Sequence, residues 1–295
     1  MERLTGLIVK AVSGFYYVEA ADCVYECKAR GIFRKKGISP SVGDMAEISV
    51  IDEGKANVEE ILPRKNYLIR PPLANLDRLF IVSSVCEPLP STLIIDKICA
   101  VAVSKGIEPV VVFTKADLAD TSELLKIYNS VGIKCFEYSI KSESDKGKIA
   151  SLIRGKVSAF TGNTGVGKSS LLNSLFPELN ISTAEISHKL GRGRHTTRHS
   201  ELYKVGGGYV ADTPGFSTVD IERYELIRKD DISGCFPEFG EYADACMFKG
   251  CAHICEKGCA VIEAVKEGRI PVSRHNSYKQ MYDEVKNIPE WMNKR

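Results

Sequence analysis

Net charge, long apolar runs and repeated sequence are all scarce in this chain of 295 residues. The formal net charge of only +2 excludes a uniformly basic surface for nucleic acid, so any such contact has to come from local clusters of Lys and Arg. No apolar run is long enough to span a bilayer, which excludes a membrane as a partner. Hydrophobic residues at 44% and charged residues at 26% give the balance of a globular protein.

The N-terminus lacks the features of a secretory signal. Met1 to Lys10 alternates apolar and polar residues, with no apolar run before a small-residue cleavage site. We therefore expect the protein to stay in the cytoplasm. Disulfides are disfavoured in a long, unsecreted chain, and half of its ten cysteines gather between Cys235 and Cys259, which favours metal binding.

The segment up to Leu62 reads as five short strands separated by turn signals such as Ser13-Gly14 and Gly43-Asp44. Short strands at this spacing favour a small antiparallel meander of the OB type, with an SH3-like barrel as the alternative. The expected strands are Leu4 to Val9, Phe15 to Glu19, Val24 to Lys28, Met45 to Val50 and Asn57 to Ile61.

After a proline-containing linker at Pro63 to Asn75, apolar runs of the buried-strand type alternate with helical patterns. This alternation predicts an α/β domain with a mainly parallel sheet and helices on both faces. A helical, cysteine-rich tail follows Asp220. The expected strands are Leu79 to Val85, Val110 to Phe113, Lys134 to Tyr138, Val157 to Phe160 and Tyr209 to Ala211, and the expected helices are Thr92 to Ser104, Ser122 to Val131 and one after Lys168.

A phosphate loop of the form G-x-x-x-x-G-K-S follows one of these strands and precedes a helix, which is the context that its chemistry needs. Its glycines let backbone N–H groups surround phosphates, Lys168 reaches the β and γ phosphates, and Ser169 supplies a magnesium ligand. A glycine-rich loop that binds nothing is the alternative. The predicted nucleotide contacts here are Gly162, Asn163, Thr164, Gly165, Val166, Gly167, Lys168, Ser169 and Ser170.

The tetrapeptide Asp212-Thr213-Pro214-Gly215 follows the last strand of the series. In this position the carboxylate of Asp212 can hold magnesium and the N–H of Gly215 can sense the γ-phosphate. Taken alone, the tetrapeptide could equally be an ordinary turn, because Asp, Pro and Gly are turn residues.

Two further strands end in residues suited to a guanine base. Asp117, in Thr114-Lys115-Ala116-Asp117, can accept both donors of the guanine Watson–Crick edge, a donor pair that adenine lacks. Ser139-Ile140-Lys141 resembles the S-A-K element that supports the base. GTPases usually have Asn at the position of Thr114. Because of this difference, the way in which the base loop is connected to the phosphate loop stays open.

The order of these motifs is rotated, because base recognition precedes the phosphate loop and the switch elements come last. Such permutation defines a small group of GTPases. Within it, the segment Gly191 to Thr197, the strand-rich start and the cysteine-histidine tail resemble the ribosome small subunit-dependent GTPase A family over essentially the whole chain. The resemblance implies an OB-like barrel at 1–66, a permuted GTPase domain at 67–222 and a zinc-binding helical module at 223–295.

The resemblance also implies roles in the switches. Thr197 is expected to close onto magnesium, with Thr196 as the alternative. Phe216 stands where many GTPases carry a water-orienting glutamine, and an apolar ring cannot polarise water. His195 is therefore the candidate that orients the attacking water, against the alternative of an exposed or RNA-facing loop residue.

Three thiolates and one imidazole, Cys246, Cys251, His253 and Cys259, form a set suited to a closed tetrahedral zinc site. Four protein ligands leave no open position, so we expect one structural zinc per chain. The competing ligands are Cys255 and Cys235.

A basic cluster in a predicted barrel loop could grip an RNA backbone while Phe33 stacks on a base, and a solvated charged loop is the alternative. Arg274, His275 and Lys279 suggest a second basic surface on the last helix. The expected RNA contacts of the barrel loop are Arg30, Phe33, Arg34, Lys35 and Lys36.

Together these expectations describe a monomer that hydrolyses GTP to GDP with Mg²⁺ and acts, as the resemblance implies, on the small ribosomal subunit and its rRNA in late maturation. One alternative is an RNA-binding scaffold with the nucleotide as a structural ligand. Another is a permuted GTPase of the large subunit.

Overall fold

The computed structural model describes residues 2–29, 33, 39–142, 145–179, 200–212 and 227–288. The chain divides into two compact units. The first comprises Met1–Arg78, Gly147–Phe160 and Leu172–Phe216, and the second comprises Leu79–Lys146, Thr161–Leu171 and Ser217–Arg295. No helix formed by the described residues is long and apolar enough to cross a membrane. The predicted domain boundaries near residues 66 and 222 stay predictions.

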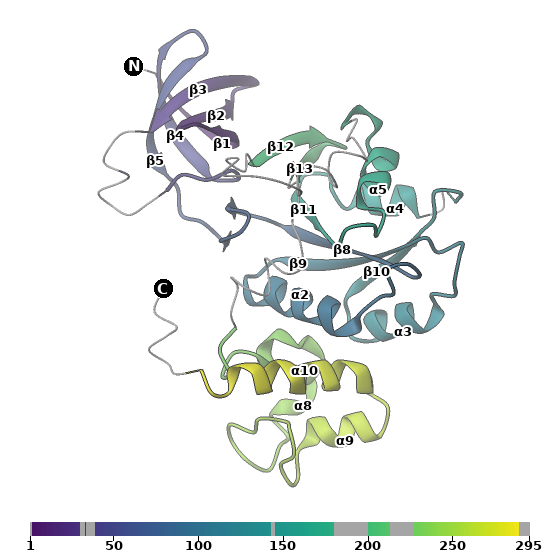
Figure 1. Cartoon of the computed structure of the whole chain (residues 1–295). Coiled ribbons are helices and arrows are strands. Elements are labelled where there is room, and N and C mark those ends of the chain that lie inside the picture. The colour runs from purple at the N-terminus through teal and green to yellow at the C-terminus, as the bar shows by residue number, and fades with distance from the viewer. Residues whose placement is uncertain are drawn as a thin grey trace, which may run out of the picture. The chain divides into compact units, whose positions relative to one another are not determined.

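The first unit begins with a five-stranded barrel of the predicted OB-like kind (Figure 1). Its strand order is β1-β2-β3-β5-β4, and β4 pairs back onto β1. The topology is not the expected simple meander, because β3 pairs in parallel with β5. The strands are β1 (Arg3–Val12), β2 (Phe15–Ala20), β3 (Cys23–Ala29), β4 (Met45–Asp52) and β5 (Lys55–Ile61).

Apolar side chains from alternate strand positions fill the barrel, as the two-residue period of a strand requires. Ile8, Val18, Ile48 and Val58 are all fully buried in this core. Phe33 joins them with only 5% of its surface exposed, so its predicted stacking on an RNA base is wrong. The ring is apolar, and burial in the barrel core removes it from water.

The rest of the first unit is a small sheet joined to the barrel. The strand β13 (Gly208–Asp212) pairs in parallel with β11 (Val157–Thr161) and antiparallel with β12 (Ser200–Val205). On its other edge β12 pairs antiparallel with β1. Smaller elements are β6 (Tyr67–Leu68), β7 (Leu73–Ala74), α4 (Lys146–Ser151) and η1 (Pro177–Leu179), while α5 (Lys168–Leu175) begins in the second unit and ends in the first.

The second unit contains three strands in the order β10-β9-β8, with β9 and β10 parallel (Figure 1). The helix α2 (Thr92–Ser104) has the predicted bounds, and the Ser91 hydroxyl accepts a hydrogen bond of 3.4 Å from the N–H of Ile94 at its N-terminus. The remaining elements are β8 (Arg78–Ser84), β9 (Glu108–Thr114), α3 (Ser122–Ser130) and β10 (Lys134–Tyr138).

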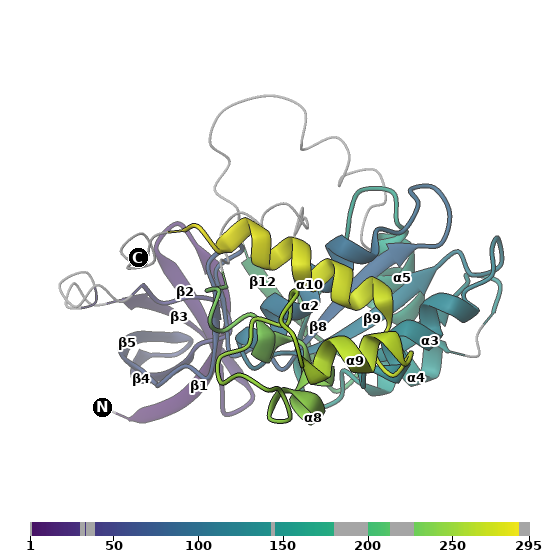
Figure 2. The same ribbon diagram turned by 90° about the horizontal axis from the view of Figure 1, so that it is seen from below.

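The cysteine-rich tail forms a helical module (Figure 2). In its aromatic core Phe236, Phe239 and Tyr278 pack together. Its long helix α10 packs against α2. The elements are η2 (Ser233–Cys235), η3 (Pro237–Phe239), α8 (Gly240–Ala243), α9 (Ala260–Lys266) and α10 (Val272–Val285).

Arg274 on α10 is completely buried and makes ion pairs of 2.7 Å with Asp96 of α2 and with Glu238 of η3. His275 is also buried. The prediction that Arg274 and His275 form a basic surface is therefore wrong, because two carboxylates within the fold compensate the buried guanidinium.

Candidate nucleotide and metal sites

Residues 162–167 connect the end of β11 at Thr161 to the start of α5 at Lys168, as the sequence predicts. Gly165 and Gly167 have φ angles of +82° and +89°, which side chains with a Cβ rarely adopt. A Cβ at Gly162 would meet the carbonyl oxygen of Val82. The Nζ of Lys168 lies 3.5 Å from the carbonyl oxygen of Gly162, so the lysine turns back toward its own loop.

Thr114 ties the base-recognition loop to the phosphate loop. Its hydroxyl donates to the carbonyl oxygen of Val166 within the phosphate loop, and it also lies 3.2 Å from the carbonyl oxygen of Ser83. Its side chain is buried, with 2% of the residue exposed. Thr114 thus forms the link that the departure from Asn left open.

Asp117 stands at the centre of a polar cluster. One carboxylate oxygen accepts a hydrogen bond of 2.9 Å from the Ser139 hydroxyl, and the other lies 2.8 Å from the Nζ of Lys141. The Lys141 ammonium and then the Ser139 hydroxyl hold the pKa of Asp117 below its usual range. The carboxylate is thereby kept ionised and is available to accept N–H donors of a base.

Lys115 connects the same loop to a third segment. Its φ angle is +59°, and its Nζ donates to the backbone carbonyl of Glu87. The sequence motif assigns Lys115 to the base loop but predicts no contact for its side chain. The contact with Glu87 shows that the side chain lies along the segment that follows β8.

Several predicted site residues lie outside the described part of the chain. These include the switch residues His195, Thr196 and Thr197, as well as Gly215 and Phe216. The backbone of Asp212 is described and ends β13, at the predicted strand terminus. The basic residues Arg30, Arg34, Lys35 and Lys36 also lie outside the described residues.

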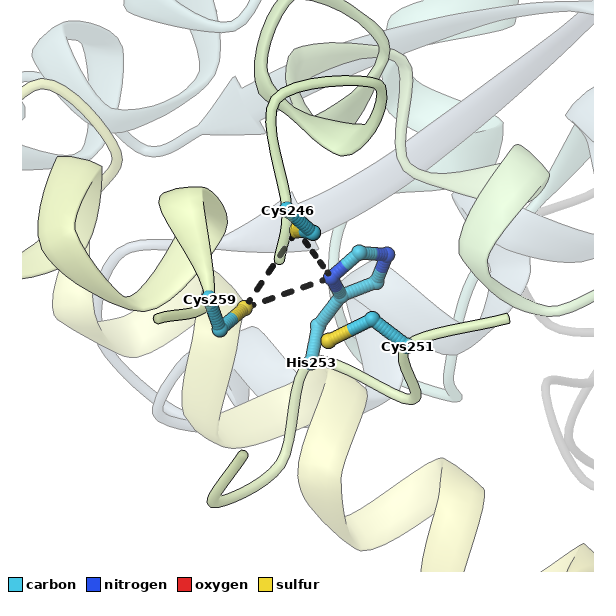
Figure 3. A group of neighbouring side chains, drawn as sticks. All are labelled: Cys246, Cys251, His253 and Cys259. Atoms are coloured by element: carbon cyan, nitrogen blue, oxygen red, sulfur yellow. Dashed lines mark hydrogen bonds between the residues drawn. The ribbon is translucent and has the colours of Figure 1, made fainter. Parts of the chain in front are cut away.

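The four predicted metal ligands, Cys246, Cys251, His253 and Cys259, come together in the second unit (Figure 3). Their ligand atoms all lie within 4.8 Å of one another. The Nδ1 of His253 is 3.6 Å from the sulfur of Cys246 and 3.4 Å from that of Cys259, and these two sulfurs are 3.8 Å apart.

These separations fit a tetrahedral metal site. Zinc–sulfur bonds of about 2.3 Å place two tetrahedral sulfur ligands about 3.8 Å apart. Burial lowers the pKa of His253, which favours the neutral imidazole that a metal requires. The cluster could therefore hold a metal ion, and the competing thiols lie elsewhere, since Cys255 is exposed and Cys235 donates to the carbonyl of Asp231 at 3.3 Å.

Residues beyond the ligands shape this cluster. The Glu256 carboxylate accepts hydrogen bonds of 2.8 to 3.0 Å from the backbone N–H groups of Ala252, Ile254 and Cys255. From α10, the Nε2 of His275 lies 2.7 Å from the carbonyl oxygen of His253. The Tyr278 hydroxyl donates to the carbonyl of Ala252 at 2.6 Å.

This role of α10 was not predicted from the sequence. The signal that could have found it is the three-residue spacing of His275 and Tyr278, which places both side chains on one face of a helix.

Comparison with known proteins agrees with this arrangement. The model of the RsgA GTPase family matches residues 61–222, and that of the RsgA N-terminal domain matches residues 5–58. The small ribosomal subunit biogenesis GTPase RsgA of Geobacillus sp. (strain WCH70) is 43% identical over 287 residues, which cover 95% of this chain and 97% of that protein. The protein of the same name from Streptococcus pneumoniae is 42% identical over 288 residues, with 97% and 96% coverage.

Two solved structures share the fold. YjeQ from Thermotoga maritima superposes with a TM-score of 0.83 and 34% identity over 98% of this chain and all of that one. YloQ, described as a circularly permuted GTPase, gives a TM-score of 0.81 and 33% identity over 98% of this chain and 96% of its own. With its motifs in the same rotated order, the chain belongs to the RsgA family of circularly permuted GTPases.

Proposed function

We propose that this GTPase acts on the small ribosomal subunit during late maturation and that the subunit stimulates its turnover of GTP to GDP and phosphate. The observation that carries the nucleotide part is the hydrogen bond from Thr114 to Val166, which joins the base loop to the phosphate loop. A guanine on Asp117 would then have its phosphates directed to the loop 162–169. The names of the close relatives support the small subunit as the partner.

Catalysis would rest on positioning and charge. Lys168 would contact the β and γ phosphates, with the backbone N–H groups of its loop around them. The hydroxyls of Ser169 and Thr197 and the carboxylate of Asp212 would hold Mg²⁺, which neutralises phosphate charge when bound. His195 would orient the attacking water, since Phe216 offers no polar group for that task.

The metal cluster would hold one zinc ion in a structural role. Its four protein ligands would complete a tetrahedron around the ion and leave no position for a substrate. The hydrogen bonds from His275 and Tyr278 to the ligand loop link the site to α10, so ligation would stabilise the whole helical module.

RNA binding would rely on phosphate contacts from Arg30, Arg34, Lys35 and Lys36, without the stacking once expected of Phe33. Such contacts are independent of sequence and weaken with salt. A partner of this kind implies action in the cytoplasm, where ribosomal subunits mature, and we expect the protein to act as a monomer.

Multiple turnover separates the enzyme from a scaffold that keeps its nucleotide. We expect each molecule to release many phosphates from GTP and the Lys168→Ala variant to bind nucleotide poorly. Release of no more than one phosphate per molecule, with or without ribosomal subunits, would instead favour the scaffold. Stimulation by the large subunit in place of the small one would support the other alternative.

A further inference from the structure

The sheet of the barrel continues into the strands β12 and β13 of the first unit. In β1, Lys10 pairs with Glu201 of β12, and in β13 Asp212 pairs with the same Glu201. Lys10, Glu201 and Asp212 therefore form one row across three antiparallel strands. Backbone pairing thus connects the barrel to the strand that ends at a predicted magnesium ligand.

An irregularity in β1 creates the edge that β12 uses. The pairing of β1 with β4 covers Arg3 to Leu7, and the pairing with β12 begins at Lys10. Between them, the register of β1 against β2 shifts between Ile8 and Lys10. An extra residue of this kind bends a strand and increases its twist. The bend lets the first part of β1 pair with β4 in the barrel and the last part pair with β12.

Two charged side chains of the barrel, Lys10 and Glu19, contact side chains of β12 and β13. The Nζ of Lys10 lies 2.9 Å from Glu201. One carboxylate oxygen of Glu19 in β2 accepts a hydrogen bond from the Nζ of Lys204. The other oxygen accepts a hydrogen bond of 3.0 Å from the hydroxyl of Tyr209. The Glu19 side chain is only 18% exposed, so these charge-assisted bonds are partly shielded from water.

In the sequence, β12 and β13 lie between two predicted magnesium ligands. Ser200, its first residue, follows Thr197 by three positions, and β13 ends at Asp212. The two strands thus carry the chain from one predicted magnesium ligand to the next.

We propose that Lys10 and Glu19 are positioning residues that couple the barrel to the nucleotide site through β12. This inference rests on the proposed function, in which the barrel contacts rRNA. Contacts on the barrel then shift β12 and, through its pairing with β13, the backbone of Asp212 at the end of that strand. Because such coupling is reciprocal, exchange of GDP for GTP changes the barrel in turn, and typical couplings amount to about 5- to 150-fold in affinity.

The direct test is hydrogen exchange at the amides of residues 10–12 with GDP and with a non-hydrolysable GTP analogue. We expect a nucleotide-dependent difference in the wild type and its loss in the Lys10→Gln/Glu19→Gln double variant. Glu26→Gln is the matched control, because Glu26 also lies in the barrel and also accepts from a tyrosine, Tyr17 at 3.2 Å, but within the barrel itself. No difference in the wild type, or an undiminished one in the double variant, overturns the proposal.

A second measurement compares the affinity of the GTP-analogue and GDP forms for purified small subunits. The double variant should bring this ratio about fivefold or more closer to one, and an unchanged ratio overturns the coupling. If no form binds the subunit, the proposed function fails, and the exchange experiment still decides the inference. Thermal unfolding checks that the variants fold. If the double variant does not fold, the single Glu19→Gln variant replaces it and should lose part of the nucleotide-dependent difference in hydrogen exchange.

Discussion

The hydroxyl of Thr114 donates to the backbone carbonyl of Val166, so a threonine performs in this chain the link between base loop and phosphate loop. Replacing it with Val keeps the shape and leaves that buried carbonyl without its partner. An unsatisfied buried group costs about 1 to 3 kcal/mol, which corresponds to roughly 5- to 150-fold in affinity. We expect Thr114→Val to weaken GTP binding within that range in a titration with labelled nucleotide.

A matched control for this prediction is Thr121→Val. Thr121 is equally buried and donates to Glu137 at 2.5 Å, but its partner lies in β10 instead of the phosphate loop. Thr121→Val should lower thermal stability and leave GTP affinity within about twofold of the wild type. Equal losses of affinity in both variants would show that Thr114 acts only through stability.

Asp117 should set the preference for guanine. Its carboxylate is kept ionised by Lys141 and Ser139, and it is matched to two N–H donors. Asp117→Asn should weaken GTP binding and favour xanthosine triphosphate, whose base offers an acceptor where guanine has a donor. Competition binding with both nucleotides tests this, and equal affinity of the variant for the two would contradict the assignment.

The metal cluster should contain about one zinc per chain when the purified protein is analysed for metals. Cys246→Ser should lose the metal and unfold the helical module first, because small metal sites gain folding free energy from ligation. Cys255→Ser is the control, since Cys255 is an exposed thiol outside the ligand set. Full metal content and thermal stability in Cys246→Ser would show that the cluster is not the site.

His195 should matter for the stimulated reaction only. His195→Ala should retain GTP affinity and subunit binding but lose about 100-fold or more of the stimulated turnover, as expected for a lost base or water-orienting group. Wild-type stimulated turnover in the variant, measured at saturating small subunit, would make the histidine a bystander. Backbone groups or rRNA would then have to orient the water.

Local signals were sufficient for much of this architecture. The bounds of α2 and β10 follow from their apolar patterns, and the four metal ligands follow from the chemistry of their side chains. The phosphate loop was recognisable because its glycines and its flanking elements are contiguous in the chain.

Contacts between residues far apart in the chain could not be predicted from the sequence. Arg274 looked like a surface cation because Asp96, which neutralises it, lies 178 residues away. Phe33 looked like a stacking residue because its basic neighbours dominate the local sequence, whereas the barrel that buries it forms from five separate strands. The parallel pairing of β3 with β5 likewise depends on closure of the barrel.

The most direct test of the account is the rate of GTP hydrolysis by the purified protein alone, with small subunits and with large subunits. We predict slow turnover by the protein alone, a rise of about 100-fold or more with small subunits, because the subunit orders and positions the switch, and little change with large subunits. Equal rates in all three reactions, or stimulation by the large subunit only, would contradict it.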